Sequence, residues 1–156
     1  MTNPTTINAP EGLPFTEIIR EFDAPVEAVY RAHTDPELVA QWLGPRGYEM
    51  EIDRFDMRPG GSYRYIHRDG DNEYAFNGVV HKASIEDGII QTFEFEGYPG
   101  AVDLEFQTFE DLGNGRTRIR GWAVYRSVED RDGMIQAGME KGVLEGYERL
   151  DEVLAK

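Results

Sequence analysis

The side chains best suited to chemistry in this chain are a histidine and two tyrosines that recur at a spacing of two. Tyr63, Tyr65 and His67 share one parity, so on a β-strand they would all project from the same face. A histidine in such a row can act as a general base or as a hydrogen-bond donor that orients a ligand. The alternative is a histidine at the end of a strand, beside a turn and partly exposed to solvent. The spacing leaves both interpretations open.

The other two histidines are less suited to a reactive role. His81 has the opposite parity to Phe76 and Gly78, which predicts that it points away from the interior. His33 ends a short helical pattern, where a positive charge interacts favourably with the helix dipole. Three scattered histidines without an HExxH motif or paired spacing predict no metal site.

No recognisable catalytic motif accompanies these histidines. The chain lacks cysteine, which excludes disulfides and thiolate chemistry. It contains neither the GxSxG motif of serine hydrolases nor a phosphate-binding loop. The sequence therefore identifies no catalytic residue, and we expect no cofactor.

Aromatic side chains alternate along the middle of the chain, and many of them carry a polar tip. The set comprises Trp42, Tyr63, Tyr65, Tyr74, Phe76, Phe93, Phe95 and Phe106. Such a pattern is typical of a core, but a pocket wall with a few convergent polar groups also suits an amphipathic small molecule. The candidate ligand-binding residues are Trp42, Tyr63, Tyr65, His67, Phe76 and Phe93, together with Met139 and Gly142 of the C-terminal helix.

Trp42 stands at the end of a short helical segment and precedes a rigid turn, "LGPRG". Pro45 cannot continue the helix and disfavours helical geometry at the residue before it. The turn can hold the indole over one end of the sheet and so help to close a cavity, or the indole can simply fill the core. Arg46 can meet a ligand carboxylate at the entrance, or it can remain a solvated loop residue.

A strand, two short helices, a strand-rich middle and a long helix must position these side chains. Residues 15–22 alternate as a strand, and two short helical segments follow, the second beginning near Asp35. From residue 48 to residue 125 the apolar period is two, and a phase change near Asp53-Arg54 indicates a β-bulge. Turn-forming stretches such as "RDGDNE" indicate antiparallel hairpins. This order predicts an α+β fold in which a curved antiparallel sheet wraps around one long helix.

The last part of the chain changes to a helical period. Its apolar stripe comprises Ile135, Met139, Val143, Tyr147, Leu150 and Leu154. The stripe predicts one helix of about 25 residues, long enough to cross a whole sheet at about 1.5 Å per residue. Gly138, Gly142 and Gly146 form a row beside the stripe, which indicates either close packing against the helix or room for a ligand along it. Small residues Gly121 and Ala123 of the last strand allow the same two interpretations.

The chain divides into a short N-terminal segment and one domain. Residues 1–14 are rich in Pro, Thr and Asn, which predicts a flexible segment. Residues 15–156 contain no internal linker or repeat, and a total of 156 residues corresponds to about one domain.

A net charge of −14 narrows the classes of partner. Binding to nucleic acid depends on Lys and Arg, and an acidic protein is repelled by anionic membranes, so we expect neither as a partner. The N-terminus has no basic region followed by an apolar stretch, and no apolar run approaches the roughly 18 residues of a membrane span. We therefore expect a cytoplasmic protein.

Trp122 has the parity of two arginines in the last strand, which predicts that it lies on the outer face of the sheet. Arg118 and Arg120 share that face, whereas Gly121 and Ala123 would face the long helix. The indole can lie flat against the arginine stems in a cation–π arrangement. Alternatively, it can contribute to a homodimer contact, because tryptophan is enriched at interfaces.

Four stretches of the sequence resemble one known superfamily. They are "DAPVEAVYRAHTDPELVAQWLGPRG", "DMRPGGSYRY", "NEYAFNGVVHKAS" and "GMEKGVLEGYERLDEVLA". Together they resemble the START-like (SRPBCC) superfamily, and most closely its small bacterial homologues of the C-terminal domain of a heat-shock chaperone ATPase activator. The resemblance covers nearly everything after Phe15. The family often has two tryptophans where this chain has Trp42-Leu43.

The resemblance implies a helix-grip fold with an internal cavity between the sheet and the long helix. Relatives bind hydrophobic ligands, and some act as cyclases or hydrolases, but the family shares no universal catalytic residue. The leading hypothesis is that the domain binds a small hydrophobic or amphipathic molecule in this cavity. One alternative is a cyclase or hydrolase that uses His67 or a cavity tyrosine, and another is an interaction module in chaperone regulation.

Overall fold

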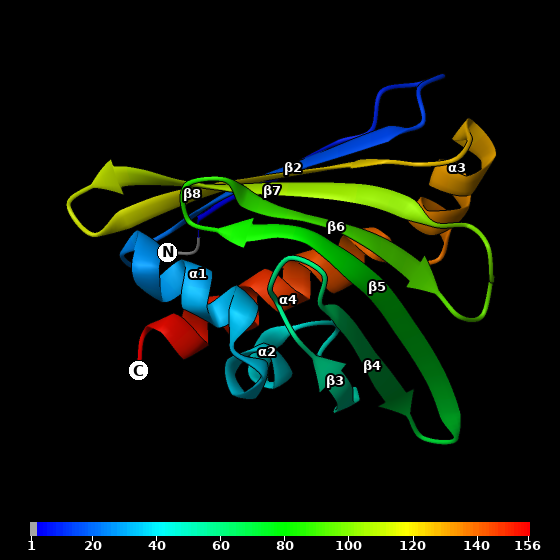
Figure 1. Ribbon diagram of the computed structural model, residues 1–156, viewed down its shortest axis with the longest axis horizontal. Helices are drawn as coiled ribbons and strands as arrows, with labels where there is room; N and C mark the ends of the chain where they lie inside the picture. Colours follow the sequence, from blue (N-terminus) through cyan, green and yellow to red (C-terminus); the bar gives the residue numbers. More distant parts are fainter. Residues whose placement is uncertain (1–2) are drawn as a thin grey trace.

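The computed structural model describes residues 3–156 as one curved antiparallel sheet wrapped around helices (Figure 1). The eight strands lie in the order β1-β2-β8-β7-β6-β5-β4-β3. They are β1 (Thr5–Asn8), β2 (Phe15–Phe22), β3 (Glu49–Phe55), β4 (Ser62–Asp69), β5 (Asn72–Ser84), β6 (Gly88–Phe95), β7 (Asp103–Gly113) and β8 (Arg116–Val124). The helices are α1 (Val26–Thr34), α2 (Pro36–Trp42), α3 (Val128–Gln136) and α4 (Met139–Leu154). The predicted α+β helix-grip architecture is confirmed.

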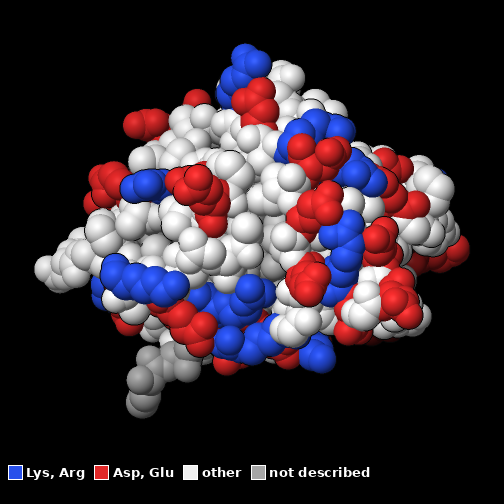
Figure 2. All heavy atoms as spheres, turned by 90° about the horizontal axis from the view of Figure 1, so that it is seen from below, with Lys and Arg blue, Asp and Glu red and all other residues white. Residues whose placement is uncertain are grey.

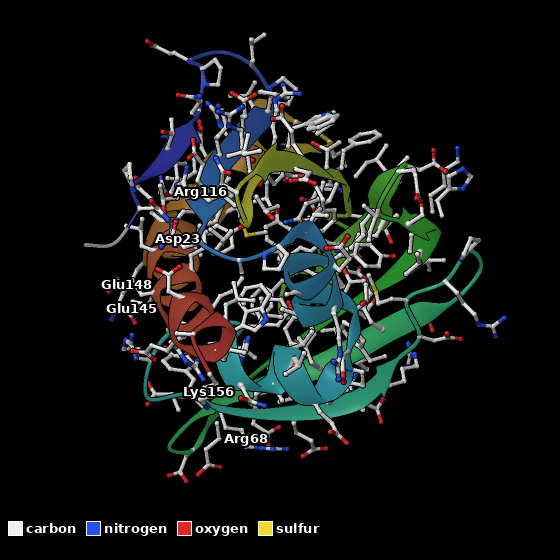
Figure 3. All side chains as sticks on the ribbon, turned by 90° about the vertical axis from the view of Figure 1, so that its left-hand side faces the viewer. Asp23, Arg68, Arg116, Glu145, Glu148 and Lys156 are labelled. Carbon is white, nitrogen blue, oxygen red and sulfur yellow. The ribbon has the colours of Figure 1, made fainter. Side chains whose placement is uncertain are left out.

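The two short helices after β2 begin and end where local chemistry requires. Pro25 precedes α1, and the Asp35 carboxylate caps α2 by accepting the backbone N–H of Glu37 at 3.0 Å. The Trp42 indole N–H donates to the backbone oxygen of Ala32 at 2.8 Å, which ties the end of α2 to α1. Seen from the side in Figure 3, the sheet wraps around these helices and α4.

The register of the sheet places the bulge where the phase of the apolar pattern changes. The pairing of β3 with β4 shifts between Ile52 and Arg54, which confirms the predicted bulge. The stretch "RDGDNE" joins β4 to β5 in the predicted hairpin. His81 is exposed, as its parity predicted.

The N-terminal segment contains a short strand that the sequence pattern does not predict, while the flexibility of residues 1–14 stays a prediction. Thr5 to Asn8 form β1 and pair with β2, with Thr5 opposite Arg20. β-branched residues favour an extended strand, and the free edge of β2 offers them unpaired backbone groups. Residues 1 and 2 lie outside the described part of the chain.

The C-terminal helical segment is broken, so the prediction of one continuous helix is wrong. α3 ends at Gln136, and Gly138 adopts a left-handed conformation with φ 97° before α4 begins. Glycine enters this region without the steric penalty that other residues meet. The apolar stripe is continuous across the break, so periodicity alone does not reveal it.

The break predicts opposite effects for two alanine substitutions. Gly138→Ala should lower the free energy of unfolding by about 1–2 kcal/mol, because alanine is strained in a left-handed conformation. Gly133→Ala, in the exposed middle of α3 with open space around its Cβ position, should raise it by up to about 1 kcal/mol. Urea unfolding of both variants measures the two changes. Stabilisation by both substitutions would instead indicate a continuous helix.

Two apolar clusters form the interior. One surrounds Phe22, Val29, Ile119 and Leu150, where the sheet, α1 and α4 meet. The other lies on β4 and β5 around Tyr63, Tyr65 and Val80. Figure 2, the molecule seen from below, shows acidic and basic side chains lying close together around an area of uncharged residues. Within residues 3–156, no helix combines the length and apolarity needed to cross a membrane.

Candidate functional site

A cavity of about 540 Å³ lies between the inner face of the sheet and the helical layer. Its wall includes residues of α2, the α3–α4 junction and α4 on one side, and of β4 to β8 on the other. All eight candidate residues from the sequence line it: Trp42, Tyr63, Tyr65, His67, Phe76, Phe93, Met139 and Gly142. The structure therefore brings the whole predicted set to one cavity.

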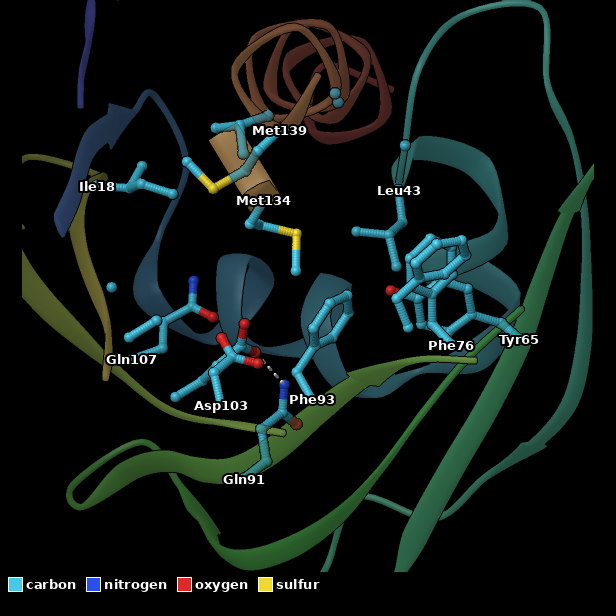
Figure 4. Close-up of a pocket in the computed structure, with 18 of the residues that line it drawn as sticks. Ile18, Leu43, Tyr65, Phe76, Gln91, Phe93, Asp103, Gln107, Met134 and Met139 are labelled. Atoms are coloured by element: carbon cyan, nitrogen blue, oxygen red, sulfur yellow. Dashed lines mark hydrogen bonds between the residues drawn. The ribbon is translucent and has the colours of Figure 1, made fainter. Parts of the chain in front are cut away.

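One end of the cavity is a continuous aromatic wall. The ring centroids of Tyr63 and Tyr65 lie 6.0 Å apart, and Phe76 stacks on Tyr65 at 5.3 Å. Phe76 also stacks on Phe93 at 5.4 Å, which extends the wall onto β6. Burial raises the pKa of both tyrosines above the ordinary range, so the phenols stay neutral at physiological pH. In Figure 4, Tyr65 and Phe76 lie at the right of the cavity, and Phe93 lies near its centre below Met134 and Met139.

His67 is more buried than the solvated alternative predicted. The side chain faces the cavity from β4 and is 6% exposed, and its Nδ1 has no hydrogen-bond partner among the described residues. Gly44 closes over the ring so tightly that a Cβ there would lie 2.6 Å from an imidazole carbon. Burial, with a smaller contribution from the Arg149 charge, lowers the pKa of His67 to about 4. The imidazole is thus neutral at pH 7 and offers a hydrogen bond rather than a charge.

The opposite end of the cavity is polar, and acidic residues of β7 dominate it. Asp103, Glu105 and Gln107 alternate on the inner face of β7 and line the cavity. Gln91 of β6 stands opposite Glu105, and its Nε2 donates to the Glu105 carboxylate at 3.2 Å (dashed line in Figure 4). Asp103 is 3% exposed, and neither of its carboxylate oxygens has a partner among residues 3–156.

The two carboxyl groups cannot both be charged in this environment. Burial, together with the neighbouring Glu105 charge, raises the pKa of Asp103 to about 9. Burial also raises the pKa of Glu105. Two acids this close in a desolvated site hold one proton between them. At neutral pH Asp103 is therefore a neutral acid, and Glu105 is the carboxyl group beside it.

This acidic pair is absent from the sequence-based candidates because apolar alternation assigns the wrong residues to the inner face of β7. The alternation of Val102, Leu104 and Phe106 suggests that they face the core, and the sequence-based aromatic set includes Phe106. In the structure Leu104 is 41% exposed, and Phe106 stacks on Trp122 with ring centroids 5.1 Å apart, on the face opposite Glu105. The pairing of Phe106 with Trp122 shows which face of β7 Phe106 occupies, because directly opposite residues on paired strands share a face.

His33 is buried and uncharged, which corrects the cationic helix end predicted for it. Its Nδ1–H donates to the Val29 oxygen at 2.7 Å, and its Nε2 accepts from the Gln107 amide at 3.3 Å. The ring packs against Trp42 and Phe109, and this burial lowers the pKa of His33 to about 4. Desolvation outweighs the attraction of the helix dipole for a cation.

Trp42 fills the core and borders the cavity at the same time. The indole is buried, its N–H is committed to Ala32, and its ring stacks on Tyr147 at 6.0 Å. It is therefore a fixed wall of the cavity rather than a movable cover. Arg46 lies outside that wall, where its guanidinium donates to Glu152 at 3.0 Å.

The three glycines at the C-terminal end serve different purposes. Gly138 makes the break between α3 and α4. Gly146 packs against the backbone after α2, where an added Cβ would lie 3.4 Å from the Trp42 oxygen. Gly142 lines the cavity, with Pro45 as its nearest neighbour at 3.9 Å from a Cβ. Close packing and space for a ligand therefore both occur in this row.

The last strand has the two faces that its parity predicted. Gly121 and Ala123 line the cavity, whereas the Trp122 ring, although this residue also borders the cavity, packs on the opposite face with the Arg120 guanidinium 4.4 Å from its centroid. This is the predicted cation–π arrangement. A homodimer contact through Trp122 stays a prediction.

An antiparallel sheet that grips a C-terminal helix around an internal cavity defines the START-like class of proteins. Residues 23–155 match the family model "Activator of Hsp90 ATPase homolog 1-like protein", and the chain belongs to this family. Members of the superfamily generally bind hydrophobic ligands. No curated protein matches the chain.

Several solved structures share the fold. A protein of Rhodobacter sphaeroides has 25% identity and a TM-score of 0.87, with 97% of this chain and 99% of that chain covered. A protein of Mycobacterium smegmatis has 23% identity and a TM-score of 0.86, with 97% of each chain covered. DynU16, a protein in the dynemicin biosynthetic locus, has 25% identity and a TM-score of 0.69, with 92% of this chain and 48% of that chain covered.

Proposed function

We propose that this protein binds a small amphipathic molecule in the cavity between the sheet and α4. The observation that carries the proposal is the division of the cavity into an aromatic end and a polar end, with Phe93 between them (Figure 4). A volume of about 540 Å³ falls within the range of roughly 300–1,000 Å³ that is typical of small-molecule sites. The ligand's apolar body would lie along Tyr65, Phe76 and Phe93, and its polar group would reach β7.

A second candidate function is catalysis in the same cavity. Asp103 is a neutral acid at pH 7 beside a second carboxyl group, Glu105, and two carboxyl groups so placed can donate and accept protons. A cyclase or hydrolase would use this pair rather than His67, whose lowered pKa makes it a weak base. Conversion of a bound ligand, followed by mass spectrometry, separates an enzyme from a binding protein. A role in chaperone regulation stays a prediction from the family alone.

Filling the cavity should weaken ligand binding without disturbing the fold. Gly121 faces the cavity, and an added Cβ would make an ordinary contact of 3.7 Å with the Phe106 oxygen. Gly121→Leu should therefore weaken binding of the neutral fluorescent probe N-phenyl-1-naphthylamine by about tenfold or more, since the side chain occupies its space.

Gly133→Leu is the matched control, because Gly133 is exposed on α3 and does not line the cavity. This variant should take up the probe like the wild type. Native mass spectrometry of freshly purified wild-type protein tests in parallel whether a ligand is carried along. Equal probe binding by the wild type and both variants would place uptake outside the cavity and contradict the proposal.

A further inference from the structure

The polar end of the cavity contains more unpaired acceptors than a folded protein normally leaves. Both carboxyl oxygens of Asp103 and the amide oxygen of Gln91 are buried, and the described part of the chain supplies no partner for them. Both side chains line the cavity, and both adjoin Glu105. The proton that Asp103 shares with Glu105 satisfies only one Asp103 oxygen, so the other Asp103 oxygen and the Gln91 amide oxygen still lack a donor. Buried polar groups in folded proteins are nearly always hydrogen-bonded, so this cluster indicates a missing donor.

Among the residues described, no lysine or arginine side chain donates a hydrogen bond to these oxygens. Neither lysine nor arginine lines the cavity within residues 3–156, although two carboxyl groups do. The other titratable groups of the cavity wall are His33 on α1, Tyr48 before β3, Tyr63, Tyr65 and His67 on β4, Tyr74 on β5, Tyr125 after β8, and Tyr147 on α4. His33 is neutral, and Tyr125 is engaged with Thr16 at 3.2 Å. The acidic pair therefore faces the cavity without a compensating charge.

We propose that the cavity selects an organic cation, an amine whose ammonium group binds Asp103, Glu105 and Gln91 while its apolar body lies on the aromatic wall. This inference rests on the proposed function and specifies the ligand class. A primary ammonium carries three N–H donors, which match two carboxylates and one amide oxygen. Among the described residues, no group of three or more His, Asp and Glu side chains is arranged to hold a metal ion. The aromatic wall beside the acidic pair suits the apolar body of an organic cation, which a metal ion lacks.

Binding of such a cation should release a proton. The empty pair holds one proton at neutral pH because burial raises the pKa of Asp103. An ammonium ion that enters brings one positive charge, which stabilises both carboxylates in their charged form. The amine enters already protonated, and the proton of the pair leaves to the buffer. Close to one proton per bound amine is the expected stoichiometry at about pH 7.5.

Three ligands with one ring system test the charge preference. Isothermal titration calorimetry at about pH 7.5 would compare 1-naphthylmethylamine, 1-naphthylmethanol and 1-naphthoic acid. Titration in phosphate and in MOPS, whose ionisation enthalpies differ, would count the protons released. The amine should bind about tenfold or more tightly than the alcohol, and the acid should bind weakest, because it adds a negative charge to the pair.

Two matched variants locate the preference in the cavity. Asp103→Asn should weaken amine binding by about tenfold and remove the proton release, while alcohol binding stays within about threefold. Asp71→Asn removes the same charge from the exposed turn between β4 and β5 and should change neither.

The outcomes separate the inference from the proposed function. Alcohol binding equal to or tighter than amine binding, or amine binding that Asp103→Asn leaves unchanged, would overturn the cation preference and leave the binding cavity standing. No binding of any naphthyl ligand or of N-phenyl-1-naphthylamine would overturn both.

Discussion

Asp103→Asn is expected to stabilise the ligand-free protein by about 2–4 kcal/mol at pH 7. The folded protein keeps Asp103 protonated, whereas the unfolded chain ionises it with an ordinary pKa of about 3.9. For each pH unit between the unfolded pKa and the folded pKa, the free energy of unfolding falls by about 1.4 kcal/mol. At pH 7 the total loss is about 4 kcal/mol. Asparagine is neutral and of similar shape, so it avoids this cost, and its amide can donate to Glu105. Part of the gain is lost because the introduced amide is itself buried.

The pH dependence of this effect has a definite sign. Because the folded pKa of Asp103 is raised, its stabilising contribution is complete below about pH 4 and is lost as the pH rises toward about 9. His33 and His67 have the opposite effect. Because their pKa values in the folded protein are lowered to about 4, they reduce the free energy of unfolding only as the pH falls from about 6.5 toward 4. Between about pH 7.5 and 8.5 both histidines are largely neutral in the folded and the unfolded state, so the slope in this window reports mainly the acidic pair.

Urea unfolding at several pH values in that window measures the prediction. The wild type should lose about 1 kcal/mol from pH 7.5 to 8.5, and Asp103→Asn should lose much less. Protein refolded from denaturant and dialysed excludes a carried ligand, which would stabilise the wild type by itself. Asp71→Asn should follow the wild-type slope. Parallel curves for the wild type and Asp103→Asn would mean that Asp103 is ionised in the folded protein.

Local patterns along the chain predict most of the fold. The alternation from residue 48 onward, its phase change at Asp53-Arg54 and the turn at "RDGDNE" each reflect a constraint that acts within a few residues. The helix break at Gly138 has no such signature, because the apolar stripe continues through it. A glycine within a helical pattern is compatible with both a continuous helix and a left-handed break.

Cavity-facing residues could be predicted only where the alternation within a single strand shows which side chains share a face. Tyr63, Tyr65 and His67 reach the cavity because their shared parity is visible in β4 alone. The direction of the β7 side chains depends on its register with β8, since Phe106 stands opposite Trp122 and stacks on it, although both residues also border the cavity. Acidic residues that face a cavity are read from a sequence as solvent-exposed, because burial of Asp103 is unfavourable for the isolated fold. A functional site often departs from local rules in this way.

The helix that roofs the cavity is anchored by a buried ion pair at its C-terminal half. Arg20 of β2 is 1% exposed, and its guanidinium donates to both oxygens of Asp151 on α4, at 2.9 and 2.5 Å. The same group donates to the backbone carbonyl oxygen of Glu21 at 2.8 Å, and it lies 4.7 Å from the centroid of the Phe22 ring. The Asp151 carboxylate therefore supplies the negative charge that balances the buried Arg20 guanidinium.

Asp151→Ala should lower the free energy of unfolding by about 3 kcal/mol and the Tm by about 6–12 °C. Removing one partner leaves the Arg20 charge buried and unpaired, which typically costs about 3–5 kcal/mol. The lower end applies because the Asp151 side chain is 28% exposed, so water can replace part of its contribution. Thermal and urea unfolding measure the change, at about 2–4 °C for each kcal/mol in a chain of this size.

The neighbouring residue of α4 provides the control. Glu152 pairs with Arg46 at 3.0 Å, but both side chains are exposed, so Glu152→Ala should change the free energy of unfolding by less than about 1 kcal/mol. Replacing both members of the buried pair, as Arg20→Met with Asp151→Leu, should restore most of the lost stability, because no charge is then left buried. Equal, small losses for Asp151→Ala and Glu152→Ala would show that the Arg20 guanidinium reaches water. A double variant less stable than Asp151→Ala would contradict this explanation. It would show that the attraction between Arg20 and Asp151 holds α4 to the sheet, and that the loss in Asp151→Ala does not come from the unpaired Arg20 charge.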